Sequence, residues 1–142
     1  TAFSNPSRRC TGIDQNRLAL LLAVMEKRLR YQLYRNDVFA SVAGGIKILE
    51  PSTDLALLIA IASSFSNHVV DSSTIVMGEV GLGGEVRAVT HLESRIKEAI
   101  NLGFEKAIIP KRNEAALSKK TKKTLSITGV ENVEQAIEFL IN

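Results

Sequence analysis

The first candidate for a residue that carries out chemistry is Ser52. It stands in Glu50-Pro51-Ser52-Thr53-Asp54, immediately before the apolar run 55–62. A serine in this position is a nucleophile when a neighbouring base takes its proton, and otherwise it caps or begins the helix that follows. His91 is a candidate base, but no spacing argument places its imidazole near Ser52. The nucleophile and the helix cap both stay open at this point.

Two basic residues that follow glycine pairs form a second candidate site. Lys47 comes after Gly44-Gly45-Ile46, and Arg87 comes after Gly83-Gly84-Glu85-Val86. Glycines let a phosphate backbone approach the chain closely, and a cation on a strand projects at a fixed angle. This setting is suited to contacts with the phosphate backbone of a nucleic acid, which read no sequence and weaken as salt rises. Weaker candidates are Arg8, Arg9 and Arg17 in the basic N-terminal segment, and ordinary exposed surface is the alternative for all of them.

Other kinds of site find little support in the residues present. The single cysteine, Cys10, excludes an internal disulfide and a cysteine-based zinc site. The glycine stretches lack the spacing of nucleotide-binding loops, and Tyr31 and Tyr34 are too few for a base-stacking platform. The apolar run 55–62 is too short to span a bilayer, so we expect no membrane partner. Within this chain we expect no cofactor and no metal.

The elements that must position these residues alternate between strands and helices. This alternation predicts an α/β domain (α+β, two-layer), in which helices pack on a sheet. A chain of 142 residues is the size of one domain. We expect an irregular connector at 1–13 and the domain itself at 14–142.

Apolar spacing and glycine positions predict the individual elements. One helix is expected to begin with Thr90 as N-cap and Glu93 in a capping box. Further helices are expected at 14–30, at 52–65 and at the C-terminus. Strands are expected at 37–49 (broken by a bulge or turn at its glycine pair), 74–77, 106–110 and 125–127, with a hairpin at 78–87 and a solvated lysine-rich loop at 119–123.

Several linked motifs, in a fixed order, carry a resemblance to a known family. Downstream they are Gly78-Glu79-Val80-Gly81-Leu82, Glu85-Val86-Arg87, Leu92-Glu93, Arg95-Ile96-Lys97-Glu98-Ala99, Gly103-Phe104 and Ala107-Ile108-Ile109-Pro110. Upstream they are Arg8-Arg9, Asn16-Arg17-Leu18, Asp37-Val38-Phe39, Val42-Ala43-Gly44-Gly45-Ile46 and Glu50-Pro51. Together these motifs, over roughly residues 7–112, resemble the C-terminal Lon-protease-like domain of the RadA (Sms) family of DNA repair and recombination proteins.

The resemblance implies a fold of the Lon proteolytic-domain type, with ribosomal protein S5 domain 2-like architecture. Full-length members carry a zinc finger and a RecA-like ATPase core upstream, form hexameric rings and drive branch migration of DNA. It therefore implies that the connector at 1–13 leads from a missing upstream ATPase core, and that ATP, Mg and Zn are bound in the missing upstream domains. The implied partners are single-stranded or branched DNA, five further copies of the chain and a recombinase of the RecA type. The implied location is the bacterial cytoplasm, or an organelle in a eukaryote.

Lon-type proteases use a serine–lysine dyad, and the resemblance allows its two positions to be compared. Ser52 falls on the position of the nucleophile, whereas Glu93 falls on that of the lysine. Asp54 replaces the glycine two residues after the serine. A carboxylate is too weak a base to activate an alcohol well at neutral pH. We therefore expect a non-proteolytic domain that holds a hexamer and contacts DNA. The alternatives are a serine peptidase with an altered dyad, or an oligomerisation module without DNA contact.

Overall fold

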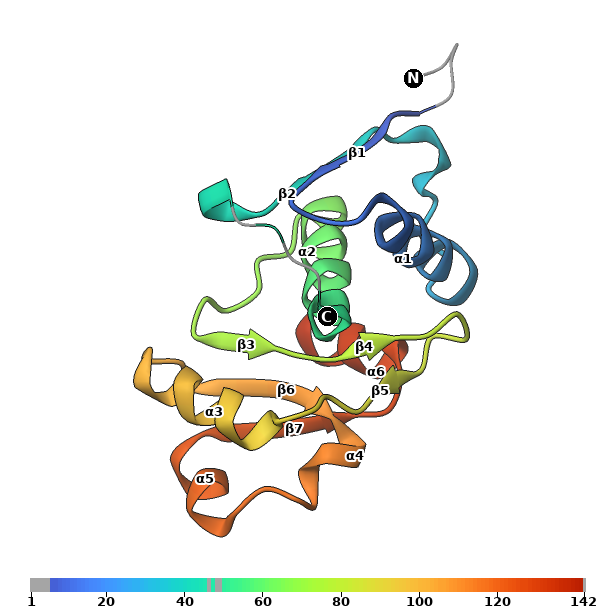
Figure 1. Ribbon diagram of the computed structural model, residues 1–142. Helices are drawn as coiled ribbons and strands as arrows, with labels where there is room; N and C mark the ends of the chain where they lie inside the picture. Colours follow the sequence, from blue (N-terminus) through green and yellow to red (C-terminus); the bar gives the residue numbers. More distant parts are fainter. Residues whose placement is uncertain (1–5, 46, 48–49, 142) are drawn as a thin grey trace. The chain divides into compact units, whose positions relative to one another are not determined.

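The computed structural model describes residues 6–45, 47 and 50–141 (Figure 1). Contacts within the chain divide it into two compact units, Thr1–Glu50 and Pro51–Asn142, which we call unit 1 and unit 2. Among the described residues no helix is long and apolar enough to cross a lipid bilayer.

Unit 1 is built from two short strands joined by a helix. Strand β1 (Arg8–Thr11) pairs in parallel with β2 (Val38–Ser41), and α1 (Gln15–Arg28) connects them. The predicted helix is confirmed: Asp14 accepts a hydrogen bond from the Arg17 amide, and the apolar stripe is buried. The prediction that residues 1–13 are irregular is wrong at β1, because these four residues find their partner strand 30 residues further along the chain.

The chain after β2 differs from the long interrupted strand expected at 37–49. Among the described residues of this stretch, 38–41 form a strand, and a 3-10 turn, η2 (Ala43–Gly45), follows it. Lys47 lies in no helix or strand. The rest of the predicted second half, residues 46, 48 and 49, lies outside the described residues.

The core of unit 2 is a parallel sheet of three strands in the order β3-β6-β7. These are β3 (Thr74–Val76), β6 (Lys106–Pro110) and β7 (Ser126–Val130). In the central strand Ala107, Ile108 and Ile109 are all buried, as expected for a strand covered on both faces. The predicted strands at 74–77 and 106–110 are confirmed, and the last strand is longer than predicted.

Helices cover both faces of this sheet. On one face α3 (Leu92–Asn101) packs Leu92 and Ile96 against Ala107 and Ile109, and α5 (Lys119–Thr124) contacts α3. Both belong to crossovers that step the same way across the sheet, so right-handed connections place them on the same face. On the other face α2 (Asp54–Ser66) contacts β3, and α6 (Val133–Leu140) contacts β7 and α2 (Figure 1). The predicted α/β class is confirmed.

A small antiparallel hairpin connects β3 to α3. It consists of β4 (Glu79–Val80) and β5 (Val86–Arg87), as predicted for 78–87. The Val86 amide donates to the Glu131 carbonyl at 2.9 Å, and the Val133 amide donates to the Gly84 carbonyl at 2.9 Å. The hairpin is therefore attached to Val133, the first residue of α6, and to Glu131, two residues before it.

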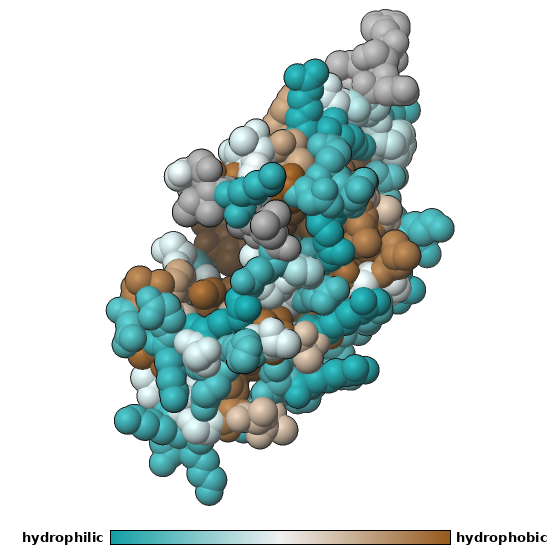
Figure 2. Space-filling view, in the orientation of Figure 1, coloured by the Kyte–Doolittle hydropathy of each residue, from teal (hydrophilic) through white to brown (hydrophobic). Residues whose placement is uncertain are grey.

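The lysine-rich stretch at 119–123 is a helix, α5, so the prediction of a loop is wrong. Ser118 caps it, since its hydroxyl accepts a hydrogen bond from the Thr121 amide. Thr121 and Leu125 are buried beneath the helix, while all four lysines are exposed. Figure 2 shows that hydrophilic side chains prevail where α3, α4 (Lys111–Glu114) and α5 lie.

Candidate functional site

Ser52 lies in a 3-10 turn, η3 (Pro51–Thr53), directly before α2. The turn is held to the strand region by backbone hydrogen bonds. The Gly78 amide donates to the Ser52 carbonyl at 2.9 Å, and the Leu55 amide donates to the Gly78 carbonyl at 3.0 Å. Ser52 is half-buried. The backbone from Ser52 to Leu55 is therefore fixed against Gly78, which leads into β4.

Asp54, the first residue of α2, is a buried carboxylate with only 3% of its surface exposed. Its Oδ2 accepts a hydrogen bond from the Val80 amide in β4 at 3.1 Å. A negative charge in the first turn also interacts favourably with the helix dipole. The carboxylate of Asp54 thus joins α2 to the hairpin.

Glu93 reaches across from α3 to the N-terminal end of α5. Its Oε1 accepts a hydrogen bond from the Ser118 amide at 3.1 Å, and this bond is the main reason that its pKa lies below the ordinary value of 4.5. At neutral pH the side chain is therefore an ion that binds a backbone amide. A carboxylate held in this form is a poor base for the serine hydroxyl.

The predicted capping box around Glu93 is wrong. The residue before α3 is His91, with φ 57, and its side chain makes no capping bond. The Thr90 carbonyl accepts a hydrogen bond from Arg95 Nε at 3.1 Å instead. The Glu93 carboxylate binds the amide of Ser118, which is 25 residues further along the chain, instead of the start of its own helix. His91 is exposed at the surface.

Ser52 and Glu93 belong to elements on different sides of the β3-β6-β7 sheet. Ser52 precedes α2, and Glu93 lies on α3, which packs on the face that carries Ala107 and Ile109. Each of the two positions thus takes part in its own connection: the serine backbone to Gly78, and the glutamate to Ser118.

Arg87 is exposed at the end of β5 and is paired with two carboxylates. It lies 3.0 Å from Glu85 Oε2 and 3.8 Å from Glu79 Oε1. The carboxylate of Glu85 has a lowered pKa, first because of its own backbone N–H and next because of Arg87. The positive charge of Arg87 is therefore partly balanced within the hairpin.

Arg8 and Arg9 are neighbours in β1 that point to opposite sides. Arg8 is half-buried: its guanidinium donates to the carbonyls of Leu33, at 2.8 Å, and Asn36, and lies 3.9 Å from Glu26. Arg9 is exposed, as the alternation of a strand requires. Arg8 therefore holds unit 1 together, whereas Arg9 is available to a partner.

Arg17 and Lys47 complete the predicted basic set. Arg17 lies in the first turn of α1 and is half-buried. Lys47 is exposed, but the strand expected to carry it is not present at that residue. Arg8, Arg9, Arg17 and Lys47 all belong to unit 1, and Arg87 belongs to unit 2.

Sequence reasoning missed two cations that lie beside Arg87. A hollow of about 390 Å³ is lined by Glu85, Val86, Arg87, Lys111, Arg112 and Glu131. Lys111 pairs with Glu114 at 3.0 Å, while Arg112 has no ion-pair partner in the described part of the chain. The sequence feature that could have revealed these two cations is their position directly after Pro110, at the end of a buried strand.

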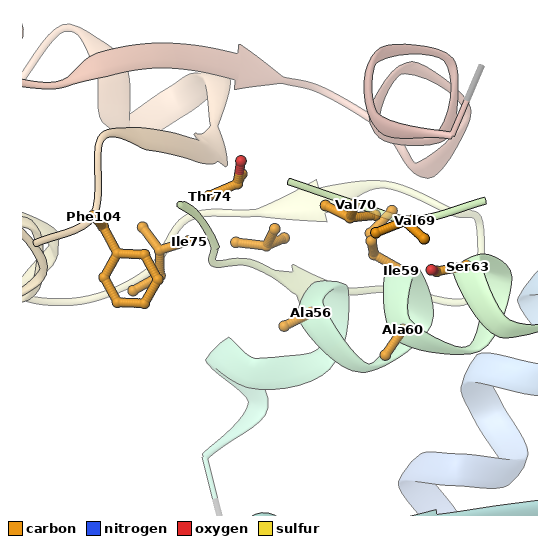
Figure 3. Close-up of a pocket in the computed structure, with 10 residues that line it drawn as sticks. Ala56, Ile59, Ala60, Ser63, Val69, Val70, Thr74, Ile75 and Phe104 are labelled. Atoms are coloured by element: carbon orange, nitrogen blue, oxygen red, sulfur yellow. The ribbon is translucent and has the colours of Figure 1, made fainter. Parts of the chain in front are cut away.

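A second, apolar hollow of about 480 Å³ lies between α2 and the edge strand β3 (Figure 3). Ile59, Val69, Val70, Ile75 and Phe104 are among its lining residues, and Ser63 and Thr74 add hydroxyl groups. None of its lining residues is an acid or a base, so it offers no proton transfer. Across residues 6–45, 47 and 50–141 no group of three or more His, Cys, Asp or Glu side chains is arranged to hold a metal ion.

A comparison with known protein families decides the relationship of this chain. The Lon protease (S16) C-terminal proteolytic domain matches residues 25–142. The chain belongs to the Lon protease C-terminal domain family.

Within this Lon-type family the chain is similar to bacterial DNA repair proteins. It is 48% identical over 139 residues to DNA repair protein RadA of Chlamydia pneumoniae, which covers 98% of the chain and 31% of that protein. It is 47% identical over 137 residues to RadA of Bacillus subtilis, which covers 96% and 30% respectively. RadA of Synechocystis sp. is 52% identical over 111 residues, 78% of the chain and 22% of that protein. The predicted resemblance to the Lon-like domain of RadA is confirmed, and the chain spans less than a third of these curated relatives.

Proposed function

We propose that this Lon-type domain is the non-proteolytic C-terminal part of a RadA-type DNA repair and recombination protein. In that protein it holds a homo-hexamer together and offers DNA a surface that reads no sequence. The proposal is supported by relatives named for DNA repair, one of which matches 98% of the chain. ATP and Mg bound by an ATPase core, Zn bound by a zinc finger, and a recombinase of the RecA type as partner, all belong to the proposed whole protein, as does a cytoplasmic location.

The observation that carries the non-proteolytic part is the environment of Glu93. The residue at the position of the dyad lysine is a carboxylate, and the Ser118 amide keeps it ionised. Asp54 likewise uses its carboxylate to hold the Val80 amide. Both departures from the Lon pattern therefore serve the fold, and neither supplies the strong base that an alcohol nucleophile requires.

The distribution of charge supports the DNA-contacting part. Unit 1 holds eight of the 18 Lys and Arg residues but only four of the 15 Asp and Glu residues. Arg9 and Lys47 are exposed there. Arg87 is a weaker contributor than expected, because Glu79 and Glu85 share its charge.

Binding of the chain to a fluorescent oligonucleotide, measured at several salt concentrations, tests this function. We expect affinity to fall steeply with salt and to be similar for unrelated sequences, as contacts with phosphates require. Lys47→Ala should weaken binding more than Arg87→Ala. A chain that shows no salt-dependent DNA binding would favour the pure oligomerisation module instead.

The second candidate, a serine peptidase with an altered dyad, rests on the presence of Ser52 at the nucleophile position. A fluorophosphonate probe reacts with activated serines, so it separates the two candidates. We expect no labelling of the chain, with Ser52→Ala as the matched control. Labelling that disappears in Ser52→Ala would establish a reactive nucleophile and contradict the proposal.

A further inference from the structure

The charged hollow beside the hairpin lies where two parallel strands end. Lys111 and Arg112, which follow β6, and Glu131, which follows β7, line it together with residues of the hairpin. The carboxyl ends of parallel strands are a common place for ligands. The volume of the hollow, about 390 Å³, falls in the range of small-molecule sites.

Two opposite charges in this hollow have no partner. The side chains of Arg112 and Glu131 are both exposed, and within the described residues they pair neither with each other nor with another group. The two other cations of the hollow, Lys111 and Arg87, are each paired with a glutamate at 3.0 Å. The guanidinium of Arg112 and the carboxylate of Glu131 are therefore the groups that remain for a ligand.

Hydrogen bonds made by other groups fix the walls of the hollow. The carbonyl of Glu131 accepts from the Val86 amide at 2.9 Å, and its amide donates to Gln135 Oε1 at 2.7 Å. The Asn113 side chain binds both the amide and the carbonyl of Val89, at 2.9 Å and 3.0 Å, so α4 is held to the segment that follows β5. The two unpaired charges thus stand on backbone that is already in place.

The charges in and around the hollow are nearly balanced. They are the cations Arg87, Lys111 and Arg112 and the acids Glu79, Glu85, Glu114 and Glu131. Such a balance provides no excess of positive charge to attract a polyanion. It suits a small ligand with one anionic group and several hydrogen-bond donors.

A phosphorylated ribose has both of these features. A guanidinium binds phosphate oxygens in a bidentate manner, and a carboxylate at the carboxyl end of a strand accepts hydrogen bonds from ribose hydroxyls in dinucleotide-binding folds. The described residues that line the hollow include no aromatic side chain on which a base could stack. We therefore expect little preference among bases.

We propose that this hollow binds a ribonucleoside monophosphate. The guanidinium of Arg112 pairs with the phosphate, the carboxylate of Glu131 accepts hydrogen bonds from the ribose hydroxyls, and the base stays in solvent. The sequence contains no G-x-x-x-x-G-K-[ST] loop, so this site is distinct in kind from the nucleotide site of an ATPase core. The inference does not depend on the proposed contact with DNA.

Titration of the isotope-labelled chain with AMP, followed through amide chemical shifts in NMR spectra, tests the site. We expect shifts at Val86, Arg112 and Glu131, and weaker binding of dAMP, adenosine and inorganic phosphate than of AMP. Arg112→Ala should weaken AMP binding by about tenfold, because a charge-assisted contact is lost. Glu131→Ala should weaken it by about fivefold and remove the difference between AMP and dAMP.

Lys123→Ala is the matched control, because it removes an exposed cation that does not line the hollow. It should leave the affinity for AMP unchanged. All three substituted side chains are exposed, so the variants should fold normally, and circular dichroism checks this.

The outcomes separate this inference from the proposed function. Binding of AMP that both Arg112→Ala and Glu131→Ala weaken supports the site, whether or not the chain binds DNA. No binding of AMP at millimolar concentration overturns it. Equal affinity for AMP and inorganic phosphate, unaffected by Glu131→Ala, would mean that the hollow takes a bare anion, and the inference is then wrong. If Arg112→Ala weakens binding of oligo(dT) but not of AMP, the hollow belongs to the DNA-contacting surface, and only the proposed function stands.

Discussion

Asp54 is the residue on which the start of α2 depends. Its buried carboxylate holds the Val80 amide, so the helix and the hairpin are joined by one side chain. Asp54→Ala leaves a buried amide without its acceptor, and we expect it to lower the free energy of unfolding by about 2 kcal/mol. Asp54→Asn keeps an acceptor oxygen and should cost less. Urea unfolding monitored by circular dichroism measures both, and an unchanged midpoint for Asp54→Ala would contradict this role.

Glu93 gives the stability of the domain a dependence on pH. Its pKa is lowered in the folded chain, chiefly by the Ser118 amide. A carboxylate with a lowered pKa stabilises the folded chain at pH values above its ordinary pKa of 4.5. This stabilisation is lost as the pH falls through the lower pKa that the group has in the folded chain. We expect Glu93→Gln, which cannot ionise, to be less stable than the parent chain at pH 7, and the difference to shrink below pH 4.5.

Thermal unfolding of both proteins between pH 7 and pH 3 measures this difference. The control is Glu98→Gln, on the exposed side of the same helix. A difference between Glu93→Gln and the parent that does not vary with pH would mean that Glu93 does not bind Ser118 as an ion.

At the scale of elements, Gly78 is the residue where β3, β4 and the Ser52 turn meet. It is buried, and its amide and carbonyl bind Ser52 and Leu55. A methyl group added here would lie 2.8 Å from Val86 Cγ1 and 3.4 Å from Leu55 Cδ2. We expect Gly78→Ala to lower the free energy of unfolding by about 2–3 kcal/mol through overpacking.

Gly103, at the end of α3, is the matched control. Its φ is +93, but a methyl group would meet nothing within 4 Å. Gly103→Ala should therefore cost only the strain of a left-handed residue, about 1 kcal/mol. Equal losses in the two variants, measured by urea unfolding, would show that packing around Gly78 is loose.

Elements with a local apolar pattern could be predicted from the sequence, and those that depend on distant partners could not. The strand at 106–110 is a continuous apolar run, and the helix after Asp14 has a clear stripe and cap. Strand β1 has no such signal, because its half-buried residues include Arg8, whose partners are Leu33 and Asn36. The prediction of a loop at α5 rested on its four lysines. It neglected Ser118, which caps the helix, and Thr121, which is buried.

In the candidate site, too, features set by local sequence could be predicted, and features that depend on distant partners could not. Sequence alone placed Ser52 before a buried helix and Glu93 at a helix start. It could not show that Glu93 binds Ser118, or that Arg87 is shared by two acids, because these contacts depend on the folded hairpin and on α5.

At the scale of the whole molecule, the basic residues are concentrated in unit 1. Unit 2 contributes the Lon-type sheet and the Ser52 and Glu93 positions. This division agrees with the proposed function, in which Glu93 and Asp54 serve the fold of unit 2 and the basic unit 1 contacts DNA. The proposed function requires above all that the domain assembles and contacts DNA.

The mass of the 142-residue chain in solution tests that claim most directly. Light scattering at low salt, with and without single-stranded oligo(dT), gives this mass. We predict either a hexamer, or a smaller species that assembles when the oligonucleotide is added. A monomer whose mass is unaffected by DNA would contradict the account, and both roles would then belong to other parts of the whole protein.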